Sequence, residues 1–168
     1  MGLGKTIQAL ALMVSRKSDD RLQKTTLIVC PVGLLRQWER EISQKLKPGH
    51  QLRTYVLHGE KRSVTWDKLR SFDVVLTTFG TLGTEYKRKE DIEAKKRGNP
   101  NWRPTSKQDH LPLLGEDSKW YRVIVDEAQC IKNKNTNAAM GAVLLQAVYR
   151  FCMTGVGHIP SKNHSIHH

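Results

Sequence analysis

Two short segments of this 168-residue chain carry the residue types that phosphoryl chemistry uses. The first, Gly2-Leu3-Gly4-Lys5-Thr6, matches the end of the phosphate-binding pattern G-x-x-x-x-G-K-[ST]. Glycines let backbone N–H groups turn toward phosphate oxygens, the lysine reaches the outer phosphates, and the threonine hydroxyl binds Mg²⁺. The segment therefore predicts a nucleotide phosphate site on Gly2, Leu3, Gly4, Lys5 and Thr6, with Thr6 as a metal ligand.

The same residues also fit a lipidation signal. Met1-Gly2-x-x-x-Thr6 matches the N-myristoylation pattern, in which the glycine accepts a fatty acyl chain. This alternative leaves the rest of the chain unexplained, so the nucleotide interpretation is preferred.

The second segment is an apolar run that ends in two neighbouring carboxylates, Val123-Ile124-Val125-Asp126-Glu127-Ala128-Gln129. In phosphoryl transfer one carboxylate holds the metal and its neighbour orients the attacking water. Asp126 is the predicted metal ligand and Glu127 the predicted base. A lone Asp-Glu pair is more often an exposed acidic turn after a strand, and the upstream Gly-Lys-Thr segment favours the catalytic interpretation.

The elements that must position these segments alternate between strands and helices. Apolar periodicity and β-branched runs predict helices over Lys5–Arg16, Leu34–Leu46 and Ala138–Val148, and strands over Thr26–Cys30, Gln51–Leu57, Asp73–Thr77, Arg122–Val125 and Tyr149–Met153. This alternation predicts an α/β fold with a parallel sheet. Lys5 and Asp126 should then meet at the carboxyl ends of the strands, where open α/β sheets bind ligands.

Composition narrows the function class further. The net charge of +12 favours polyanionic partners, nucleic acid first and acidic membranes second. No apolar run is long enough to cross a bilayer, so no membrane role is expected, and no secretory signal opens the chain. The three cysteines, Cys30, Cys130 and Cys152, are odd in number and widely spaced, which favours a reducing compartment over a disulfide framework.

One basic segment interrupts the pattern, within an insertion that spans about residues 86–118. Lys87 to Lys107 holds eight basic residues against three acidic ones, including Lys95, Lys96 and Arg97, and then the breakers Gly98, Pro100 and Pro104. A solvated surface insertion is one interpretation. The other is contact with nucleic acid, with Trp102 as a stacking residue.

Five segments occur in the order of helicase motifs I, Ia, Ib, II and III. They are GLGKTIQALAL, LIVCPVGLLRQWEREI, VVLTTFGTL, RVIVDEAQCIKN and RFCMTG. Over residues 1–155 the chain closely resembles the Swi/Snf-type ATPases of helicase superfamily two. The DEAQ-x-IKN form, with a long basic insert before it, is similar to fungal members of the DNA-repair and SUMO-linked translocase subgroup.

This resemblance implies a RecA-like P-loop NTPase lobe, the first of two motor lobes, with a mainly parallel sheet flanked by helices. Such proteins hydrolyse ATP to translocate on double-stranded DNA in the nucleus, and they remodel nucleosomes or displace bound proteins. Lys5 and Thr6 would bind ATP and Mg²⁺, and Asp126 and Glu127 would serve hydrolysis. Gln129 would couple the nucleotide site to Thr154-Gly155, the start of motif III.

The resemblance also implies contacts to the DNA backbone from the segment between Pro31 and Trp38 and from Thr77 and Thr78. For Trp38 the preferred interpretation is a core aromatic residue on an amphipathic helix. Because Thr77 and Thr78 end a strand, helix capping is as good an explanation of them as phosphate contact.

Three departures from the family pattern leave two hypotheses open. The chain begins inside the nucleotide loop, it holds no second motor lobe, and residues 156–168 depart from the motif that should follow Gly155. We expect those residues to form a disordered tail, whose four histidines bind metal only adventitiously. The chain is an ATP-dependent DNA translocase lobe, or it is a catalytically inactive fragment that binds nucleic acid or a protein partner through its basic surface.

Overall fold

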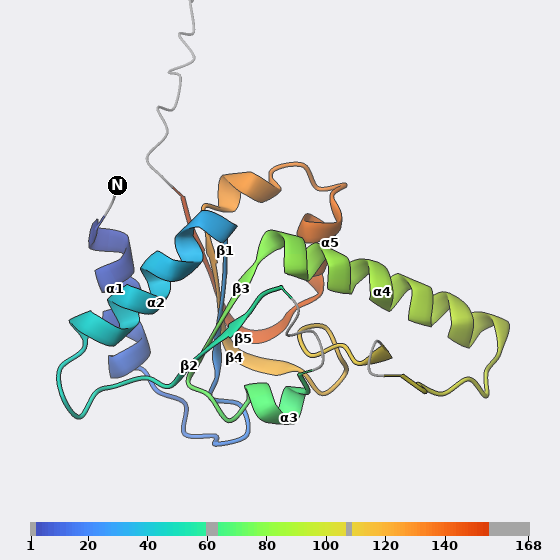
Figure 1. Ribbon diagram of the computed structural model, residues 1–168, viewed down its shortest axis with the longest axis horizontal. Helices are drawn as coiled ribbons and strands as arrows, with labels where there is room; N and C mark the ends of the chain where they lie inside the picture. Colours follow the sequence, from blue (N-terminus) through green and yellow to red (C-terminus); the bar gives the residue numbers. More distant parts are fainter. Residues whose placement is uncertain (1–2, 60–63, 107–108, 155–168) are drawn as a thin grey trace, which may run out of the picture.

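A computed structural model describes residues 3–59, 64–106 and 109–154. Its centre is a five-stranded sheet in which every pairing is parallel, in the order β2-β3-β1-β4-β5 (Figure 1). The strands are β1 (Thr26–Cys30), β2 (Thr54–Leu57), β3 (Val74–Thr78), β4 (Lys119–Asp126) and β5 (Gln146–Met153). The predicted α/β architecture with a parallel sheet is confirmed.

Helices cover both faces of the sheet (Figure 1). α1 (Leu3–Ser15) and α2 (Leu35–Lys45) lie on one face, and α3 (Trp66–Leu69), α4 (Phe79–Gly98) and α5 (Asn137–Leu144) lie on the other. Two 3₁₀ turns, η1 (Val32–Leu34) and η3 (Ala128–Ile131), follow β1 and β4. β1 and β3 are buried at every position because they are covered on both faces, which explains the apolar runs Leu27–Cys30 and Val74–Leu76.

The core divides into two apolar clusters, one on each face of the sheet. Ala9, Leu10, Met13 and Trp38 belong to the α1–α2 side. The α4–α5 side includes Leu82, Tyr86, Trp120 and Leu145. Among the described residues, no helix has both the length and the apolar character that a bilayer crossing demands.

The predicted boundary between the last helix and the last strand was wrong. The helix expected over 138–148 ends at Leu144, and β5 begins at Gln146 rather than at Tyr149. The run from Ala138 to Val148 is almost continuously apolar, so its periodicity suits a buried helix and a strand equally. Buried Leu145 forms the turn between the two elements.

The basic segment is largely helical, which the sequence analysis did not anticipate. α4 is 20 residues long and contains all the basic residues from Lys87 to Arg97. The helix starts with a cap, because the Thr78 hydroxyl accepts a hydrogen bond of 3.1 Å from the Thr81 N–H. The helix ends at Gly98, and the helix-breaking residues Pro100 and Pro104 come shortly after it. The many charged residues obscure the helical periodicity in the sequence, because the apolar face is confined to positions such as Leu82, Tyr86 and Ile92.

A buried carboxylate ties α4 to the chain that returns from the insertion. Glu85 is 1% exposed, and one of its oxygens accepts hydrogen bonds of 2.6 and 2.8 Å from the N–H groups of Leu113 and Leu114. Burial raises the pKa of Glu85 to about 7, although these hydrogen bonds act to lower it. The indole of Trp120 reaches the same returning segment, donating to the Leu113 carbonyl at 3.2 Å.

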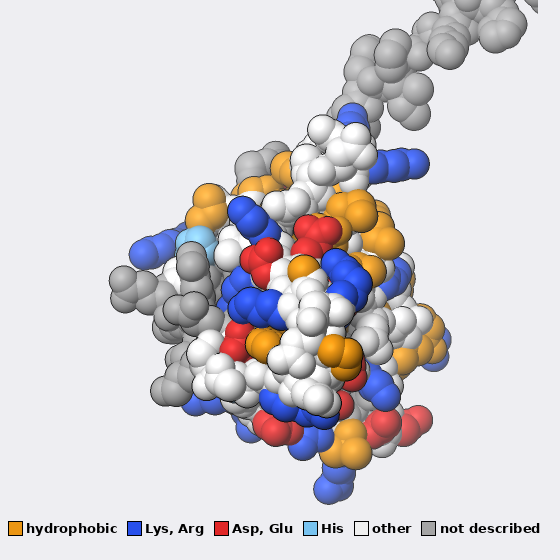
Figure 2. Space-filling view, turned by 90° about the vertical axis from the view of Figure 1, so that its right-hand side faces the viewer, with side chains coloured by type: hydrophobic (Ala, Val, Ile, Leu, Met, Phe, Trp, Pro, Cys, Tyr) orange, Lys and Arg blue, Asp and Glu red, His pale blue; other side chains and the backbone are white. Residues whose placement is uncertain are grey.

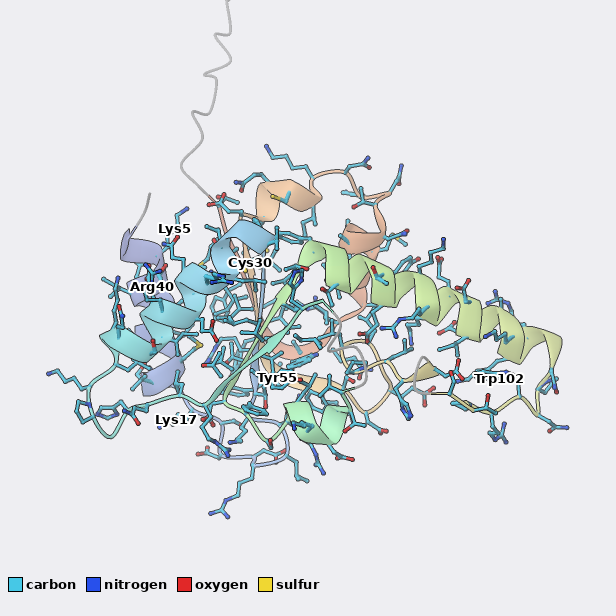
Figure 3. All side chains as sticks on the ribbon, in the orientation of Figure 1. Lys5, Lys17, Cys30, Arg40, Tyr55 and Trp102 are labelled. Carbon is cyan, nitrogen blue, oxygen red and sulfur yellow. The ribbon has the colours of Figure 1, made fainter. Side chains whose placement is uncertain are left out.

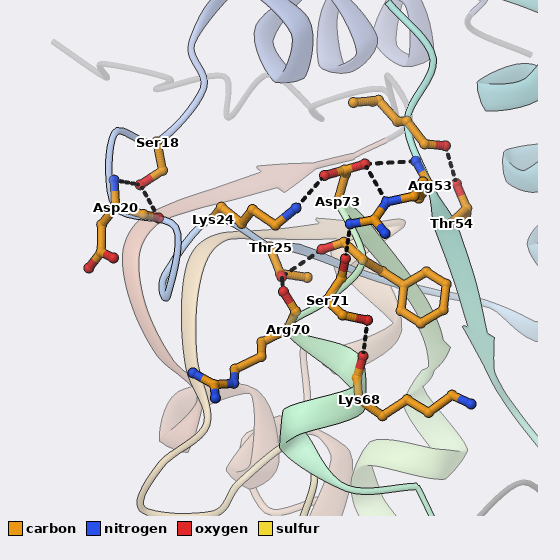
Figure 4. Close-up of polar contacts among 12 residues, drawn as sticks. Ser18, Asp20, Lys24, Thr25, Arg53, Thr54, Lys68, Arg70, Ser71 and Asp73 are labelled. Atoms are coloured by element: carbon orange, nitrogen blue, oxygen red, sulfur yellow. Dashed lines mark hydrogen bonds and ion pairs between the residues drawn. The ribbon is translucent and has the colours of Figure 1, made fainter.

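At the amino ends of the strands, Asp73 joins three chain segments (Figure 4). One carboxylate oxygen lies 2.8 Å from the Lys24 ammonium, and the other accepts a 2.8 Å hydrogen bond from the Arg53 N–H. Burial acts to raise the pKa of Asp73, but these contacts outweigh it and lower the pKa. The carboxylate therefore stabilises the folded chain in its charged form.

We expect Asp73→Asn to destabilise the fold by about 1 to 3 kcal/mol, because it removes a charge-assisted contact to a backbone N–H. The lowered pKa means that this contribution is complete above about pH 4 and is lost as the pH falls through the folded-state value. Urea unfolding of the two proteins at neutral and acidic pH measures the difference, which should narrow on acidification. Asp67→Asn is the matched control, since Asp67 makes an exposed ion pair with Arg70 and should matter little.

Candidate active site

The Gly-Lys-Thr segment and the paired carboxylates meet in one pocket at the carboxyl ends of the strands. Its lining residues come from α1, η1, α2 and the end of β4, with the residue after it. They are Lys5, Thr6, Leu34, Gln37, Trp38, Glu41, Asp126 and Glu127. The two segments are far apart in the sequence, and the parallel sheet brings them together as its topology requires. Met1 and Gly2 lie outside the described residues, and Leu3 begins α1.

Lys5 lies in the first turn of α1, at the same end of the sheet as Cys30 (Figure 3). Its ammonium group donates a hydrogen bond to the carbonyl of Thr154, directly after β5. The predicted phosphate-binding lysine is therefore in contact with the residue predicted to start motif III. Gly155, the other residue of that prediction, lies outside the described residues.

Asp126, the last residue of β4, is 9% exposed, and each of its carboxylate oxygens accepts a hydrogen bond from a neutral donor. The indole N–H of Trp38 donates to Oδ2 at 2.9 Å, and the Glu127 N–H donates to Oδ1 at 2.9 Å. Burial, followed by the charge of Asp126, raises the pKa of Cys30 to about 12. Burial therefore favours the protonated thiol, which is the less nucleophilic form.

Glu127 adopts the left-handed backbone conformation, with φ of 55°. It is the one non-glycine residue with positive φ in the described part of the chain. Glu127 lines the pocket, and the side-chain amide of Gln129 donates a hydrogen bond to its carboxylate. Strain of this kind costs about 1 to 2 kcal/mol and is concentrated at functional sites.

The structure gives Trp38 a second contact beyond the predicted core packing. The residue is 2% exposed and belongs to the α1–α2 core cluster, yet its one polar atom is bonded to Asp126. The side chains of Thr77 and Thr78 are buried and engaged within the fold. The Thr77 hydroxyl donates to the Leu57 carbonyl at 2.9 Å, and Thr78 caps α4. Pro31 is partly exposed and leads into η1 at the head of α2.

Sequence reasoning missed Glu41, a second carboxylate in the pocket. It is 7% exposed, accepts hydrogen bonds from Gln37 at 3.0 Å and Lys45 at 3.3 Å, and lines the same pocket as Thr6. Burial acts to raise the pKa of Glu41, but these hydrogen bonds outweigh it and lower the pKa. An acidic residue on the apolar face of an amphipathic helix is the signal that could have identified it.

The donor set of the pocket fits Mg²⁺. Within the described ranges, no group of three His, Cys, Asp or Glu side chains could hold a metal by itself. Mg²⁺ usually binds one or two protein oxygens and takes its remaining ligands from phosphates and water. The Thr6 hydroxyl and the Asp126 carboxylate would supply two such oxygens. The space among the lining residues is about 40 Å³, room for an ion and a water molecule rather than a whole nucleotide.

The basic residues of the insertion lie away from this pocket. Trp102 is on the opposite side of the molecule from Lys5 (Figure 3), and the Lys95 ammonium lies 5.6 Å from the centre of its ring. Lys96 pairs with Glu116 at 3.7 Å, while Arg97 is exposed. Figure 2 shows this end of the molecule, where Lys and Arg side chains are interspersed with acidic ones. Any role of this surface is therefore separate from the chemistry of the pocket.

Comparison with known proteins agrees with the resemblance found in the sequence. The family model described as the SNF2-related domain matches residues 1–164, which extends past residue 155, where the resemblance was expected to end. An uncharacterized ATP-dependent helicase of Schizosaccharomyces pombe is 46% identical over 92% of this chain and 14% of its own length. The ATP-dependent helicase ULS1 of Saccharomyces cerevisiae is 35% identical over 92% of this chain and 10% of its own length. The chain thus spans a small part of these relatives.

A solved structure has the same fold. It is the Sulfolobus solfataricus SWI2/SNF2 ATPase core in complex with double-stranded DNA, with a TM-score of 0.64 and 29% sequence identity. The similarity covers 94% of this chain and 26% of that one.

The strain at Glu127 can be measured by a pair of substitutions. Glu127→Gly and Glu127→Ala both remove the carboxylate, but only glycine relieves the left-handed conformation. We expect the glycine variant to be about 1 kcal/mol more stable than the alanine variant in chemical unfolding. Equal stabilities would show that the turn at Glu127 is not strained.

Proposed function

Because the chain belongs to the SNF2-related family of ATPases, we propose that it is the ATP-binding lobe of an ATP-dependent translocase on double-stranded DNA. The family is that of ATP-dependent helicases and remodellers, and the fold is RecA-like. One observation carries the proposal for this chain. Lys5, Thr6, Asp126 and Glu127 line a single pocket at the carboxyl ends of a parallel sheet.

Each side chain has a role in the proposed reaction. Lys5 binds the outer phosphates of ATP, and Thr6 and Asp126 hold Mg²⁺. When bound, Mg²⁺ neutralises charge on the phosphate oxygens. Glu127 orients the attacking water, and the Gln129 amide holds its carboxylate in place. The contact between Lys5 and Thr154 supports a coupling between the nucleotide site and the end of β5.

Double-stranded DNA is the proposed polymer substrate. The solved neighbour is an ATPase core bound to such DNA, and this chain carries a net charge of +12. Sequence-independent binding to phosphates is what that charge supports. The proposed contacts are the segment that starts at Pro31, at the head of α2, and the basic side of α4. Action on nucleosomes or other DNA-bound proteins, in the nucleus, completes the proposal.

A second candidate function is supported by the position of the insertion. Lys95, Lys96 and Arg97 lie at the far end of α4 from the pocket, so they can bind nucleic acid or an acidic partner whether or not ATP is hydrolysed. Under this alternative, the 168 residues act as a binding module without catalytic activity. Measurements of ATP turnover and of DNA binding separate the two functions.

We expect no appreciable ATP turnover from residues 1–168 alone, even with all four pocket residues intact. In this family the second lobe supplies an arginine finger, which is worth about 10³ to 10⁵ in rate. A DNA-stimulated ATPase assay should therefore detect activity only in a longer chain that includes that lobe. In the longer chain, Glu127→Gln should abolish turnover. Turnover by the short chain that Glu127→Gln removes would show that one lobe is sufficient.

We also expect weak DNA binding that does not depend on base sequence and falls steeply with salt. Each phosphate contact contributes about 0.9 to the slope of log affinity against log salt concentration. Replacing Lys95, Lys96 and Arg97 by glutamine should therefore weaken binding and flatten that slope in fluorescence anisotropy titrations.

The matched control replaces the exposed residues Lys17, Arg21 and Lys47, which lie near the amino ends of the strands. It removes the same charge from another face and should change the salt slope less. Equal effects of the two triple variants would leave the insertion as solvated surface.

A further inference from the structure

Helix α2 contacts a predicted ligand of Mg²⁺. The indole N–H of Trp38 donates to Oδ2 of Asp126 at 2.9 Å, and both residues line the pocket. A rigid helix therefore reaches the predicted metal ligand at the end of β4.

We propose that Trp38 is a positioning residue that orients Asp126 for Mg²⁺. The inference rests on the proposed function, because it concerns the metal of the same site. Trp38 acts through the Asp126 carboxylate, which would be the group that binds the metal.

The chemistry of an indole suits this task. Indole has one N–H donor and no acceptor, so it fixes one carboxylate oxygen without removing the charge that attracts a cation. A lysine or arginine at the same place would neutralise Asp126 and repel Mg²⁺. With Oδ1 held by the Glu127 N–H, the contact from Trp38 defines the plane of the carboxylate.

The packing around Trp38 fixes its own position. The side chain is 2% exposed and lies in a cluster with Leu10, Leu35 and Ile42. A buried tryptophan does not require a carboxylate as its partner. The indole of Trp120, fully buried on the other face, donates to a backbone carbonyl instead. The choice of Asp126 as the partner of Trp38 therefore calls for an explanation in terms of the site.

The test compares the nucleotide affinity of two variants, with Mg²⁺ and with a chelator, using a non-hydrolysable ATP analogue in calorimetry. Trp38→Phe removes the contact to Asp126, and Trp120→Phe is the control for losing a buried indole. We expect the ratio of the affinities with Mg²⁺ and with chelator to fall about tenfold or more in Trp38→Phe, as for other residues that orient metal ligands, and to be kept in Trp120→Phe.

A second measurement uses the unsubstituted chain, so it does not depend on the folding of any Trp38 variant. The chain has four tryptophans, whose indole N–H signals can be followed by NMR. With the analogue present, Mn²⁺ in place of Mg²⁺ should broaden the Trp38 signal before those of Trp66, Trp102 and Trp120. Asp126→Asn should remove this selectivity.

The outcomes distinguish failure of the inference from failure of the proposed function. If the unsubstituted chain binds the analogue equally with Mg²⁺ and with chelator, and Mn²⁺ broadens no indole signal, the proposed function fails at this site and the inference fails with it. If binding depends on Mg²⁺ but Trp38→Phe behaves like Trp120→Phe, only the inference is overturned. A loss of the Mg²⁺ effect in Trp38→Phe alone supports it.

Discussion

The organisation of this protein depends on a charged carboxylate at the end of a buried strand. Asp126 has little access to water, so its oxygens need donors from the protein. A backbone N–H from the turn at Glu127 and an indole N–H from α2 supply them. The first contact accompanies the left-handed turn, and the second attaches α2 to β4. The same carboxylate helps to keep the neighbouring Cys30 thiol protonated.

The two ends of the sheet have different tasks. At the amino ends, Asp73 is paired with Lys24 and with the backbone of Arg53, and these contacts hold β1, β2 and β3 in place. At the carboxyl ends, polar groups face a pocket and one residue adopts a strained backbone conformation. In a parallel sheet all strands end on the same side, so stabilising contacts can gather at one edge while the other carries the chemistry.

The basic insertion is attached to this framework without entering the pocket. Glu85 holds the returning chain by two backbone N–H groups, and Trp120 adds a contact to the same segment. α4 then carries its positive charge away from the sheet as a continuous helix. Substitutions in α4 can therefore alter binding to a polyanion without altering the residues of the nucleotide site. Any coupling between the two surfaces has to pass through the sheet and its helices.

The sequence by itself determined the fold class, the position of β1 and the segments that form the pocket, because buried parallel strands and phosphate-binding loops have local signatures. It did not reveal α4, whose charged residues conceal a narrow apolar face, or the boundary of α5, where an apolar run suits both helix and strand. Only the tertiary structure placed Trp38 against Asp126, and Glu41 in the pocket that Thr6 also lines. Those contacts join residues from separate elements. Their partners are decided by how α2 packs between α1 and β4, which no local pattern in the sequence encodes.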